Sequence, residues 1–348
     1  MANLIADIGG TNARFGLWDA SEQHLENSAR LSRVKYFLTS DFPSLAEAIT
    51  AYCQDPTIGH QNIQLRHLSL AVAGPVEKDW VTMSNNSWSF SKAELKKHLG
   101  LECLTVINDF TAQALLPPAL GKSEKQLIRT GTPIAGTPIA ILGPGTGLGM
   151  SALVPLHQQS EGQPIDKQRN EDSKGADKIA WRPLETEGGN VPFALRTPEE
   201  LALMQFVMDE TGRTVSFEDI LSGRGLERAY RFCTPSAPAL SAADITAHAA
   251  DNPNARQAIF LFLNCLSNFV LTAIMMTGAR QGVYLSGGII PRLLPFFAAS
   301  EFDKRLTEYG IFTDYISSVP IWLITAQEPG LTGAGLALSN PYIQHRKL

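Results

Sequence analysis

Short apolar runs alternate with amphipathic segments along the chain, and the runs end in small or polar residues. Residues 67–74 and 103–109 are two such runs, rich in β-branched residues, which is typical of buried strands in a mixed or parallel sheet. Residues 4–19 have the pattern of a strand, a glycine turn and a second strand, and a further strand is expected around residues 34–39. The pattern therefore predicts several strands in the first third of the chain.

Helix starts are marked between these runs by a Ser or Thr that is followed three residues later by a Glu. In this arrangement the hydroxyl and the carboxylate satisfy free backbone N–H groups at the helix N-terminus. The pairs are Ser44 with Glu47, Ser91 with Glu94, and Thr197 with Glu200. Strands that alternate with capped helices predict an α/β fold, in which ligands gather at the carboxyl ends of the strands.

Two segments far apart in the chain repeat one pattern. Residues 5–19 and 141–154 both contain an apolar strand, a glycine-rich turn with a Thr, and a second apolar strand. A fold built from two related halves would produce this repetition. The long apolar stretch 258–279 is interrupted by polar residues, so we expect a buried helix there rather than a membrane span.

Length and composition narrow the class of protein. A chain of 348 residues exceeds one ordinary core and predicts two domains. The net charge is -5 and the 29 Lys and Arg residues are scattered, which argues against a nucleic-acid partner. Four widely spaced cysteines and the lack of a signal-peptide pattern indicate a cytoplasmic protein without a membrane partner.

The first glycine turn has the residues of a phosphate site. A turn of this kind lets backbone N–H groups converge on an anion, and phosphate is the natural guest. Gly9, Gly10 and Thr11 would supply the donors, while Asp7 would act through a magnesium ion because its charge repels phosphate. A tight hairpin without a ligand is the alternative, since Asp and Gly are good turn formers.

The second glycine turn weakens that alternative. It contains more glycine than a hairpin needs, namely Gly143, Gly145, Gly147 and Gly149, with Thr146 among them. The segment lacks the G-K-[ST] of a P-loop, and Leu148 breaks the spacing of a dinucleotide-binding turn. A third glycine pair, Gly287 and Gly288, ends the run VYLSGG. Three glycine-rich strand ends predict one nucleotide held from several sides.

Two polar residues stand at the carboxyl end of the apolar run 103–109, Asn108 and Asp109. Phosphoryl transfer requires charge neutralisation, alignment and a group that accepts the proton of the attacking hydroxyl. Asp109 is a candidate for that base, and Asn108 is a candidate for hydrogen bonds to sugar hydroxyls. The alternative is that Asp109 only caps the segment that follows it.

Five ordered segments of the chain together resemble the bacterial-type glucokinase family. They are DIGGTNAR (7–14), NNSWSF (85–90), INDFTA (107–112), GTGLG (145–149) and LSGGI (285–289), and the matches continue to residues 329–331. Each motif alone is weak, whereas their order is specific. The resemblance implies an α/β fold of the two-domain ribonuclease-H-like type found in actin and hexokinase, with ATP in the cleft between the domains.

The resemblance also implies a domain division and an activity. The small domain would comprise residues 1–117 plus 328–348, and the large domain residues 118–327. The two glycine hairpins would embrace the phosphates of ATP from opposite domains. The implied activity is the magnesium-dependent phosphorylation of D-glucose to glucose 6-phosphate by ATP, the first step of glycolysis, and a homodimer is expected.

Single residues receive roles by the same resemblance. Asp109 takes the position of the catalytic base, and the sugar-binding residues are Asn108, Glu187, Asn190 and Glu218. The residues expected at the nucleotide are Asp7, Gly9, Gly10, Thr11, Asn12, Gly145, Thr146, Gly147, Gly287 and Gly288, and Asp7 would reach Mg2+ through water. Glu218 has an alternative role, as a favourable acid in the first turn of a helix capped by Ser216.

One position departs from the family pattern, which has His where this chain has Asn190. Asn still donates an N–H, although its reach is shorter and it lacks a ring to pack. A kinase for a related hexose therefore stays open beside a glucose kinase, as does a catalytically weak sugar-binding regulatory protein. A chaperone ATPase ranks last. The polar segment 158–178 precedes this loop, and we expect no chemistry from it.

Overall fold

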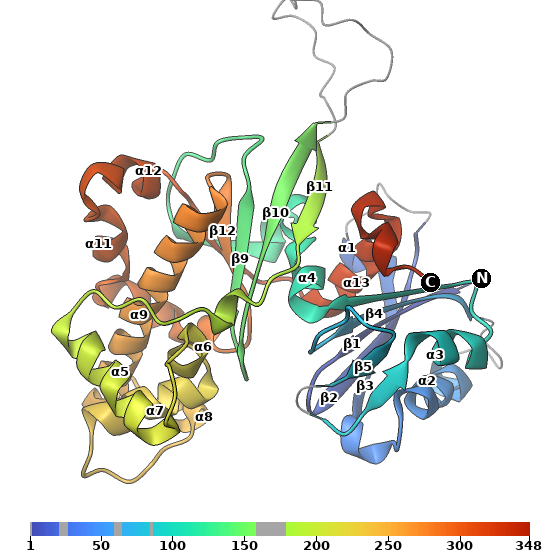
Figure 1. Ribbon diagram of the computed structural model, residues 1–348, viewed down its shortest axis with the longest axis horizontal. Helices are drawn as coiled ribbons and strands as arrows, with labels where there is room; N and C mark the ends of the chain where they lie inside the picture. Colours follow the sequence, from blue (N-terminus) through green and yellow to red (C-terminus); the bar gives the residue numbers. More distant parts are fainter. Residues whose placement is uncertain (1, 21–26, 59–64, 84–85, 158–178) are drawn as a thin grey trace, which may run out of the picture.

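The computed structural model describes residues 2–20, 27–58, 65–83, 86–157 and 179–348 (Figure 1). The polar segment 158–178 and Asn85 of the NNSWSF motif lie outside the described residues. Two larger sheets occupy opposite sides of the molecule, and a two-stranded sheet of β5 (Trp80–Thr82) and β6 (Ser89–Ser91) accompanies the first of them. The mixed α/β class predicted from the alternating pattern is confirmed.

The first sheet has the strand order β3-β2-β1-β4-β7. Its strands are β1 (Ala2–Ile8), β2 (Asn12–Trp18), β3 (Leu31–Leu38), β4 (Leu65–Val72) and β7 (Cys103–Asn108). β1 pairs antiparallel with β2 and parallel with β4, and β4 pairs parallel with β7. The strands predicted around residues 4–19, 34–39, 67–74 and 103–109 are therefore confirmed.

The second sheet has the order β11-β10-β9-β12-β13-β8. Its strands are β8 (Lys125–Arg129), β9 (Ile139–Pro144), β10 (Leu148–His157), β11 (Ile179–Leu184), β12 (Gly282–Leu285) and β13 (Ile321–Ile324). As in the first sheet, a central strand has antiparallel neighbours on one side and parallel neighbours on the other. This matching order confirms the two related halves that the repeated sequence pattern predicted.

Helices cover the sheets and connect their strands (Figure 1). The α-helices are α1 (Asn27–Arg30), α2 (Leu45–Gln54), α3 (Lys92–His98), α4 (Asp109–Ala114), α5 (Pro198–Thr211), α6 (Phe217–Ile220), α7 (Gly223–Cys233), α8 (Ala242–His248), α9 (Pro253–Thr277), α10 (Ile290–Leu293), α11 (Phe302–Thr307), α12 (Thr313–Ser317) and α13 (Pro329–Ser339). Short 3-10 helices are η1 (Thr39–Asp41), η2 (Pro56–Ile58), η3 (Pro117–Ala119), η4 (Lys122–Glu124), η5 (Gly188–Asn190), η6 (Leu294–Ala299), η7 (Gly310–Phe312) and η8 (Pro341–Arg346).

The predicted hydroxyl caps are present, but the predicted return bonds from the carboxylates of Glu47, Glu94 and Glu200 to the cap residues are not among the hydrogen bonds of these described helix starts. Ser44, Ser91 and Thr197 each accept a hydrogen bond from the backbone N–H three residues later. The carboxylate of Glu200, however, accepts from the backbone N–H of Arg196. Glu200 is fully buried and is held by the guanidinium of Arg305, so the return bond to the cap residue gives way to a buried ion pair.

The long apolar helix α9 forms the centre of the second half. By length and composition α9 could cross a membrane, yet 78% of its apolar window is buried inside the protein. Its side chains pack against α7, α8 and α11 in the largest hydrophobic cluster among the described residues. The expectation of a buried core helix, made for residues 258–279, is confirmed.

A third apolar cluster joins the two sheets. Helices α4 and α13 lie between them (Figure 1), and Ile107, Ile141 and Leu331 are among the buried residues that meet there. The helices approach closely because Gly333 lacks a side chain, since a Cβ there would lie 2.2 Å from the carbonyl oxygen of Ala112. Helix α13 also packs against β1 and β4 of the first sheet. The boundaries at residues 117 and 328 stay a prediction.

Candidate active site

Asp109 stands where β7 meets α4, at the carboxyl end of the edge strand of the first sheet, which pairs parallel with β4. Asn108 is the N-cap of α4, and its Oδ1 accepts from the N–H groups of Phe110 at 2.9 Å and Thr111 at 3.3 Å. The cap therefore uses the oxygen of the Asn108 amide and leaves its Nδ2 as a donor. Oδ1 of Asp109 accepts a bond of 2.9 Å from the N–H of Phe110.

The surroundings of Asp109 hold its proton unusually tightly. Burial raises the pKa of Asp109 to about 7, and the charges of Asp7 and Glu187 add to the rise. The backbone N–H of Phe110 opposes them only in part. Two carboxylates predicted from separate motifs, Asp7 and Glu187, therefore act on Asp109 through space. A carboxyl group with a pKa near neutrality is suited to proton transfer.

Phe110 anchors Asp109 against the second sheet. Gly143 and Gly149 are register partners in β9 and β10. A Cβ on Gly143 would lie 2.3 Å from the Phe110 ring, and a Cβ on Gly149 would lie 1.9 Å from it. The pair thus forms a slot for an aromatic ring, as glycines do where another group approaches a strand closely. In the sequence, the extra glycines of the second turn indicated phosphate binding. For Gly143 and Gly149, packing against Phe110 is the reason instead.

The first glycine turn, between β1 and β2, is fixed by its neighbours. The N–H of Gly9 donates to the carbonyl of Asn12 at 2.9 Å. The hydroxyl of Thr39 donates to the carbonyl of Gly10 at 2.9 Å, and the amide of Asn86 donates to the carbonyl of Gly9 at 3.0 Å. Thr39 and Asn86 thus hold two carbonyl groups of the turn from outside, and the N–H of Gly9 is used within it. The turn can present its remaining N–H groups to an anion.

Arg14 is a site residue to which the sequence motif assigned no role. Its Nη1 donates to Oδ2 of Asp7 at 2.8 Å, and its Nε lies 3.4 Å from Oε2 of Glu328. A signal was available, because a hairpin that turns at residues 9–12 places residue 14 directly opposite residue 7. The side chain of Asp7 is 14% exposed. Burial raises the pKa of Asp7, and the charge and hydrogen bond of Arg14 offset part of that rise.

The start of α13 closes the other side of Asp7. Glu328 has a left-handed backbone (φ 51) and directly precedes α13. A Cβ on Gly330 would lie 2.3 Å from Oδ2 of Asp7, so the helix backbone reaches this carboxylate. Oδ1 of Asp7 takes no hydrogen bond from another described residue. That oxygen can accept a bond from a metal-bound water, which fits the predicted water-mediated contact with Mg2+.

The second glycine turn is stabilised by bonds from its own half of the protein. The N–H of Gly145 donates to the carbonyl of Gly147 at 2.8 Å, and Gly145 accepts from Gly223 at 2.9 Å. Gly287 has φ 90, and a Cβ there would lie 2.3 Å from the carbonyl oxygen of Pro144. The third glycine pair therefore adjoins the second turn, as expected for strand ends that share one ligand.

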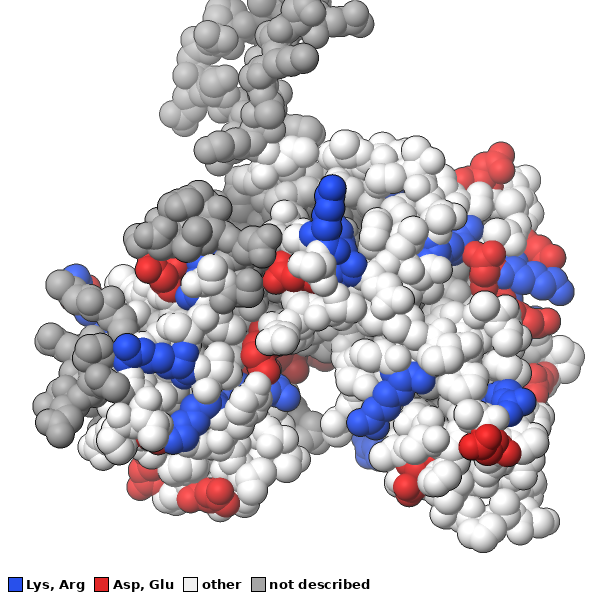
Figure 2. Space-filling model, turned by 180° about the vertical axis from the view of Figure 1, so that it is seen from behind, with Lys and Arg blue, Asp and Glu red and all other residues white. Residues whose placement is uncertain are grey.

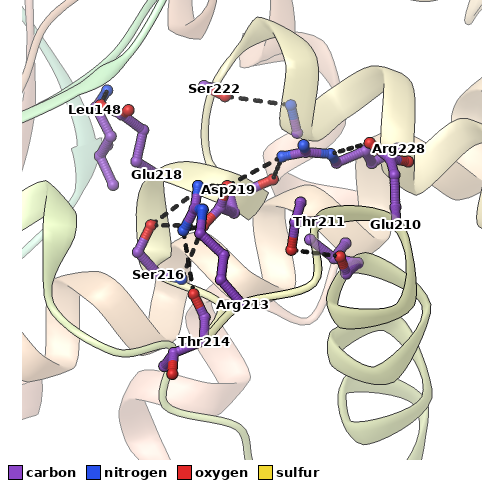
Figure 3. Close-up of polar contacts among 12 residues, drawn as sticks. Leu148, Glu210, Thr211, Arg213, Thr214, Ser216, Glu218, Asp219, Ser222 and Arg228 are labelled. Carbon is purple, nitrogen blue, oxygen red and sulfur yellow. Dashed lines mark hydrogen bonds and ion pairs between the residues drawn. The ribbon is translucent and has the colours of Figure 1, made fainter.

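Glu218 contacts this same turn. Its Oε2 accepts the N–H of Leu148 at 2.9 Å (Figure 3). Glu218 also lies in the first turn of α6, which Ser216 caps in a complete capping box with Asp219. The structural role suggested for Glu218 is therefore confirmed, while its contact with a sugar stays a prediction.

An ion-pair network fixes α6 in place (Figure 3). Both oxygens of Asp219 accept from the guanidinium of Arg213, at 2.8 and 2.9 Å. Arg228 donates to Asp219 at 3.2 Å and also to Glu210 at 3.0 Å. Asp219 is 6% exposed and Arg228 11%, so their pair is largely shielded from water, whereas Arg213 is 60% exposed and closes the network at the surface. The network holds the helix from which Glu218 reaches the glycine turn.

A small pocket of about 80 Å³ brings two predicted sugar residues together. Asn108 and Glu187 line it, together with Thr111, residues 74–77, Glu185 and Thr186. Glu218 and Asn190 are not among its lining residues. Asn190 ends η5 with an exposed side chain, and its N–H donates to the carbonyl of Glu187 at 3.0 Å.

The loop at residues 74–77 is a second feature without a predicted role. Its sequence GPVE follows β4, whose carboxyl end lies beside that of β7. Because ligands gather at the carboxyl ends of neighbouring parallel strands, this position was the signal that could have identified the loop.

A hollow separates two lobes of the molecule, and acidic side chains lie at it (Figure 2). In the described part of the chain, no group of three or more His, Cys, Asp or Glu side chains is arranged to hold a metal ion. A magnesium ion that depends mainly on water and phosphate oxygens does not require such a group.

Two sheets of matching order, each with a glycine hairpin, define a two-domain α/β protein of the ribonuclease-H-like class.

Comparison with known proteins identifies the family. A family model described as Glucokinase matches residues 4–166 and 175–341. A curated glucokinase of Pectobacterium atrosepticum is 36% identical over 341 residues, 96% of each chain. The crystal structure of glucokinase from an Antarctic psychrotroph is 30% identical, with a TM-score of 0.77 over 97% of this chain and 99% of that chain. The chain belongs to the glucokinase family.

A more distant structure shows that the fold persists when the sequence has changed. The glucokinase from Balamuthia mandrillaris, solved in complex with glucose, is 18% identical to this chain and has a TM-score of 0.72. The alignment covers 97% of this chain and 93% of that chain. At this identity the likeness concerns the fold alone.

Proposed function

We propose that this protein transfers the terminal phosphoryl group of ATP to the 6-hydroxyl of D-glucose. The observation that carries the proposal is Asp109, a carboxyl group with a pKa of about 7 between two glycine turns and beside the pocket of Asn108 and Glu187. Membership of the glucokinase family supports the substrate pair. A protein with this activity yields ADP and glucose 6-phosphate.

The step requires one proton acceptor. Asp109 takes the proton of the sugar 6-hydroxyl, while that oxygen forms a bond to the terminal phosphorus and the bond to the β-phosphate oxygen breaks. The helix N-terminus that begins at Asp109 favours its charged form, and burial favours the neutral product. The same residue can therefore receive a proton and later release it to solvent.

The two glycine turns hold the nucleotide. N–H groups of Gly10, Thr11 and Asn12 would face the phosphates from one half, where Gly9, whose own N–H is bonded to the carbonyl of Asn12, shapes the turn. From the other half, Thr146, Gly147, Gly287 and Gly288 are proposed to contact the phosphates, and Gly145, whose N–H is bonded to the carbonyl of Gly147, holds the shape of the second turn. Asp7 would hold Mg2+ through a water molecule, and the ion, when bound, would neutralise the negative charge that develops on the phosphates.

The sugar contacts follow from the remaining polar residues. Asn108 donates its free Nδ2, and Glu187 accepts from a sugar hydroxyl. Glu218 and Asn190 complete the site if the lobes approach each other when the ligands bind. A related hexose is the second candidate substrate, because the exposed Asn190 replaces the family His. A homodimer and a cytoplasmic location are further parts of the proposal.

A panel of hexoses tests the proposal. Purified protein with ATP and Mg2+ is expected to phosphorylate glucose, with an Asp109→Ala variant losing about two to four orders of magnitude in kcat. Turnover of another hexose in preference to glucose would favour the second candidate. Sugar binding without phosphorylation of any hexose would favour a regulatory protein, and full activity of Asp109→Ala would remove the proposed base.

A further inference from the structure

The segment 340–348 pairs with the edge of the first sheet. The N–H of Leu348 donates to the carbonyl of Leu104 at 2.9 Å, and the N–H of Leu104 donates back at 3.2 Å. Lys347 forms an antiparallel bridge with Thr105. These bonds extend the sheet beyond β7, the strand that ends at Asn108. The segment thus pairs with the otherwise open edge of β7, the strand that directly precedes the proposed base, Asp109.

The same segment is bonded to the second sheet. The side chain of Asn340 donates to the carbonyl of Trp181 in β11 at 3.0 Å. Nε of Arg346 donates to Oε1 of Glu185 at 3.0 Å, and its Nη2 donates to the other oxygen of the same carboxylate. A fork-to-fork pair of this kind fixes orientation as well as distance. Glu185 directly follows β11 and lies two residues before Glu187.

Arg346 has a second partner, the loop at residues 74–77. Its Nη1 donates to the carbonyl of Val76 at 2.9 Å, and its Nη2 lies 3.4 Å from Oε1 of Glu77. The ammonium of Lys92 donates to the same carbonyl at 2.5 Å. The Arg346 side chain is only 10% exposed, so its contacts are largely shielded from water. One guanidinium therefore joins the 340–348 segment to two other parts of the chain, Glu185 and the loop at residues 74–77.

The two parts that Arg346 contacts both line the pocket of Asn108 and Glu187. Val76, Glu77 and Glu185 are themselves lining residues of that pocket. Burial alone would raise the pKa of Glu185, but the hydrogen bonds and charge of Arg346, aided by His345, hold it below the ordinary value. Glu185 therefore stays charged and paired. Without Arg346 it would keep only the His345 ring, 3.6 Å away, as a partner, beside a site that already contains Glu187.

We propose that the 340–348 segment latches the two halves together at the sugar pocket, and that Arg346 is a positioning residue for sugar binding. Arg346 does not contact the reacting atoms. It acts by fixing the loop at residues 74–77 against Glu185, which sets the position of Glu187. The inference deepens the proposed function, because it concerns the sugar site of that reaction.

The first test compares Arg346→Ala with a matched control, Arg129→Ala. Arg129 is equally buried, at 9% exposure, and bonds Asp303 and the carbonyls of Ile316 and Val319, all within the second half. Arg346→Ala is expected to raise both KM and the Kd for glucose about tenfold, or ~1.4 kcal/mol, with KM for ATP within about twofold. Arg129→Ala should lower Tm and leave both sugar constants unchanged.

A double-mutant cycle separates positioning from general damage. In the Glu185→Ala background, Arg346→Ala is expected to change the Kd for glucose by less than about twofold, because its main partner is already gone. Additive effects of the two substitutions would overturn the inference. So would a sugar Kd in Arg346→Ala equal to that of the parent, or an equal rise in KM for ATP.

The failure of the inference is distinguishable from failure of the proposed function. The Kd for glucose is measured by titration calorimetry without ATP, so it does not depend on turnover. If the parent binds no hexose, the proposed function fails and the latch fails with it. If the parent binds glucose and Arg346→Ala binds it equally well, only the latch is wrong.

Discussion

The two glycine turns repeat one sequence pattern but use their glycines differently. In the first turn, a Cβ on Gly9 would meet its nearest neighbour, the carbonyl oxygen of Asn12, only at 3.4 Å. In the second, Cβ atoms on Gly143 and Gly149 would overlap the ring of Phe110. Space for backbone N–H groups explains the first turn, whereas space for a neighbouring side chain explains part of the second.

This difference shows what a glycine count can and cannot indicate. The excess of glycine in the second turn suggested phosphate, and part of the excess instead admits Phe110, the residue after Asp109. The packing still serves the site, because the ring places the start of α4 against the second sheet. The first half thus supplies Asp109, and the second half positions it.

Matched glycine substitutions give the largest expected effect. Gly149→Ala is expected to lower the free energy of unfolding by about 1–3 kcal/mol, because a Cβ cannot share the space of the Phe110 ring. Gly9→Ala should change it by less than about 0.5 kcal/mol, since its Cβ meets no close neighbour. Urea unfolding of both variants measures the comparison, and kcat should fall in Gly149→Ala because α4 shifts.

A cycle with Phe110 assigns the cause. If the overlap is responsible, Phe110→Ala costs less stability in the Gly149→Ala background than in the parent. Independent effects of the two changes would show that the slot has another purpose. A greater loss in Gly9→Ala than in Gly149→Ala would reverse the comparison of the turns.

The charge of Asp109 gives an effect of intermediate size on stability. The raised pKa of about 7 means that Asp109 stabilises the fold fully below its ordinary value of 3.8 and that this contribution is lost as pH rises through about 7. Asp109→Asn stays neutral, so its Tm should exceed that of the parent by about 2 °C or more at about pH 8. The gap should narrow toward about pH 5. A gap independent of pH would mean that Asp109 is not buried against other carboxylates.

Asn190→His gives the smallest expected effect. His reaches farther than Asn and adds a ring that can pack against a sugar. We expect a KM for glucose lower by about three- to tenfold, or ~1 kcal/mol, with KM for ATP unchanged. The same hexose panel serves as the measurement. A stronger gain for a different hexose would show that position 190 determines which sugar is preferred, rather than how tightly glucose is bound.

Much of the fold could be predicted because its signals are local. Ser44, Ser91 and Thr197 announce helices through bonds that span three residues. The hairpins could be predicted from their own glycine turns, and the repeated pattern indicated two halves. Glu200 shows where local reasoning ends, because its carboxylate pairs with Arg305, more than a hundred positions away.

The site was predictable only where a motif carries its chemistry. Asp109, Asp7 and Glu187 could be named, and the charges of Asp7 and Glu187 do act on Asp109. Arg346 could not be found, because it meets Glu185 across 161 positions and no pattern links them. Contacts between the halves depend on how two sheets pack, which hydrophobic periodicity does not encode.

The central claim is that Asp109 is the proton acceptor, and a pH profile tests it most directly. For the parent, kcat/KM for glucose at saturating ATP and Mg2+ should rise with pH through the Asp109 pKa of about 7 and then level off. Asp109→Asn should lose about two to four orders of magnitude and show no rise near that pH. A parent profile that is flat between about pH 5.5 and 8.5, or an Asp109→Asn variant as active as the parent, would contradict the account.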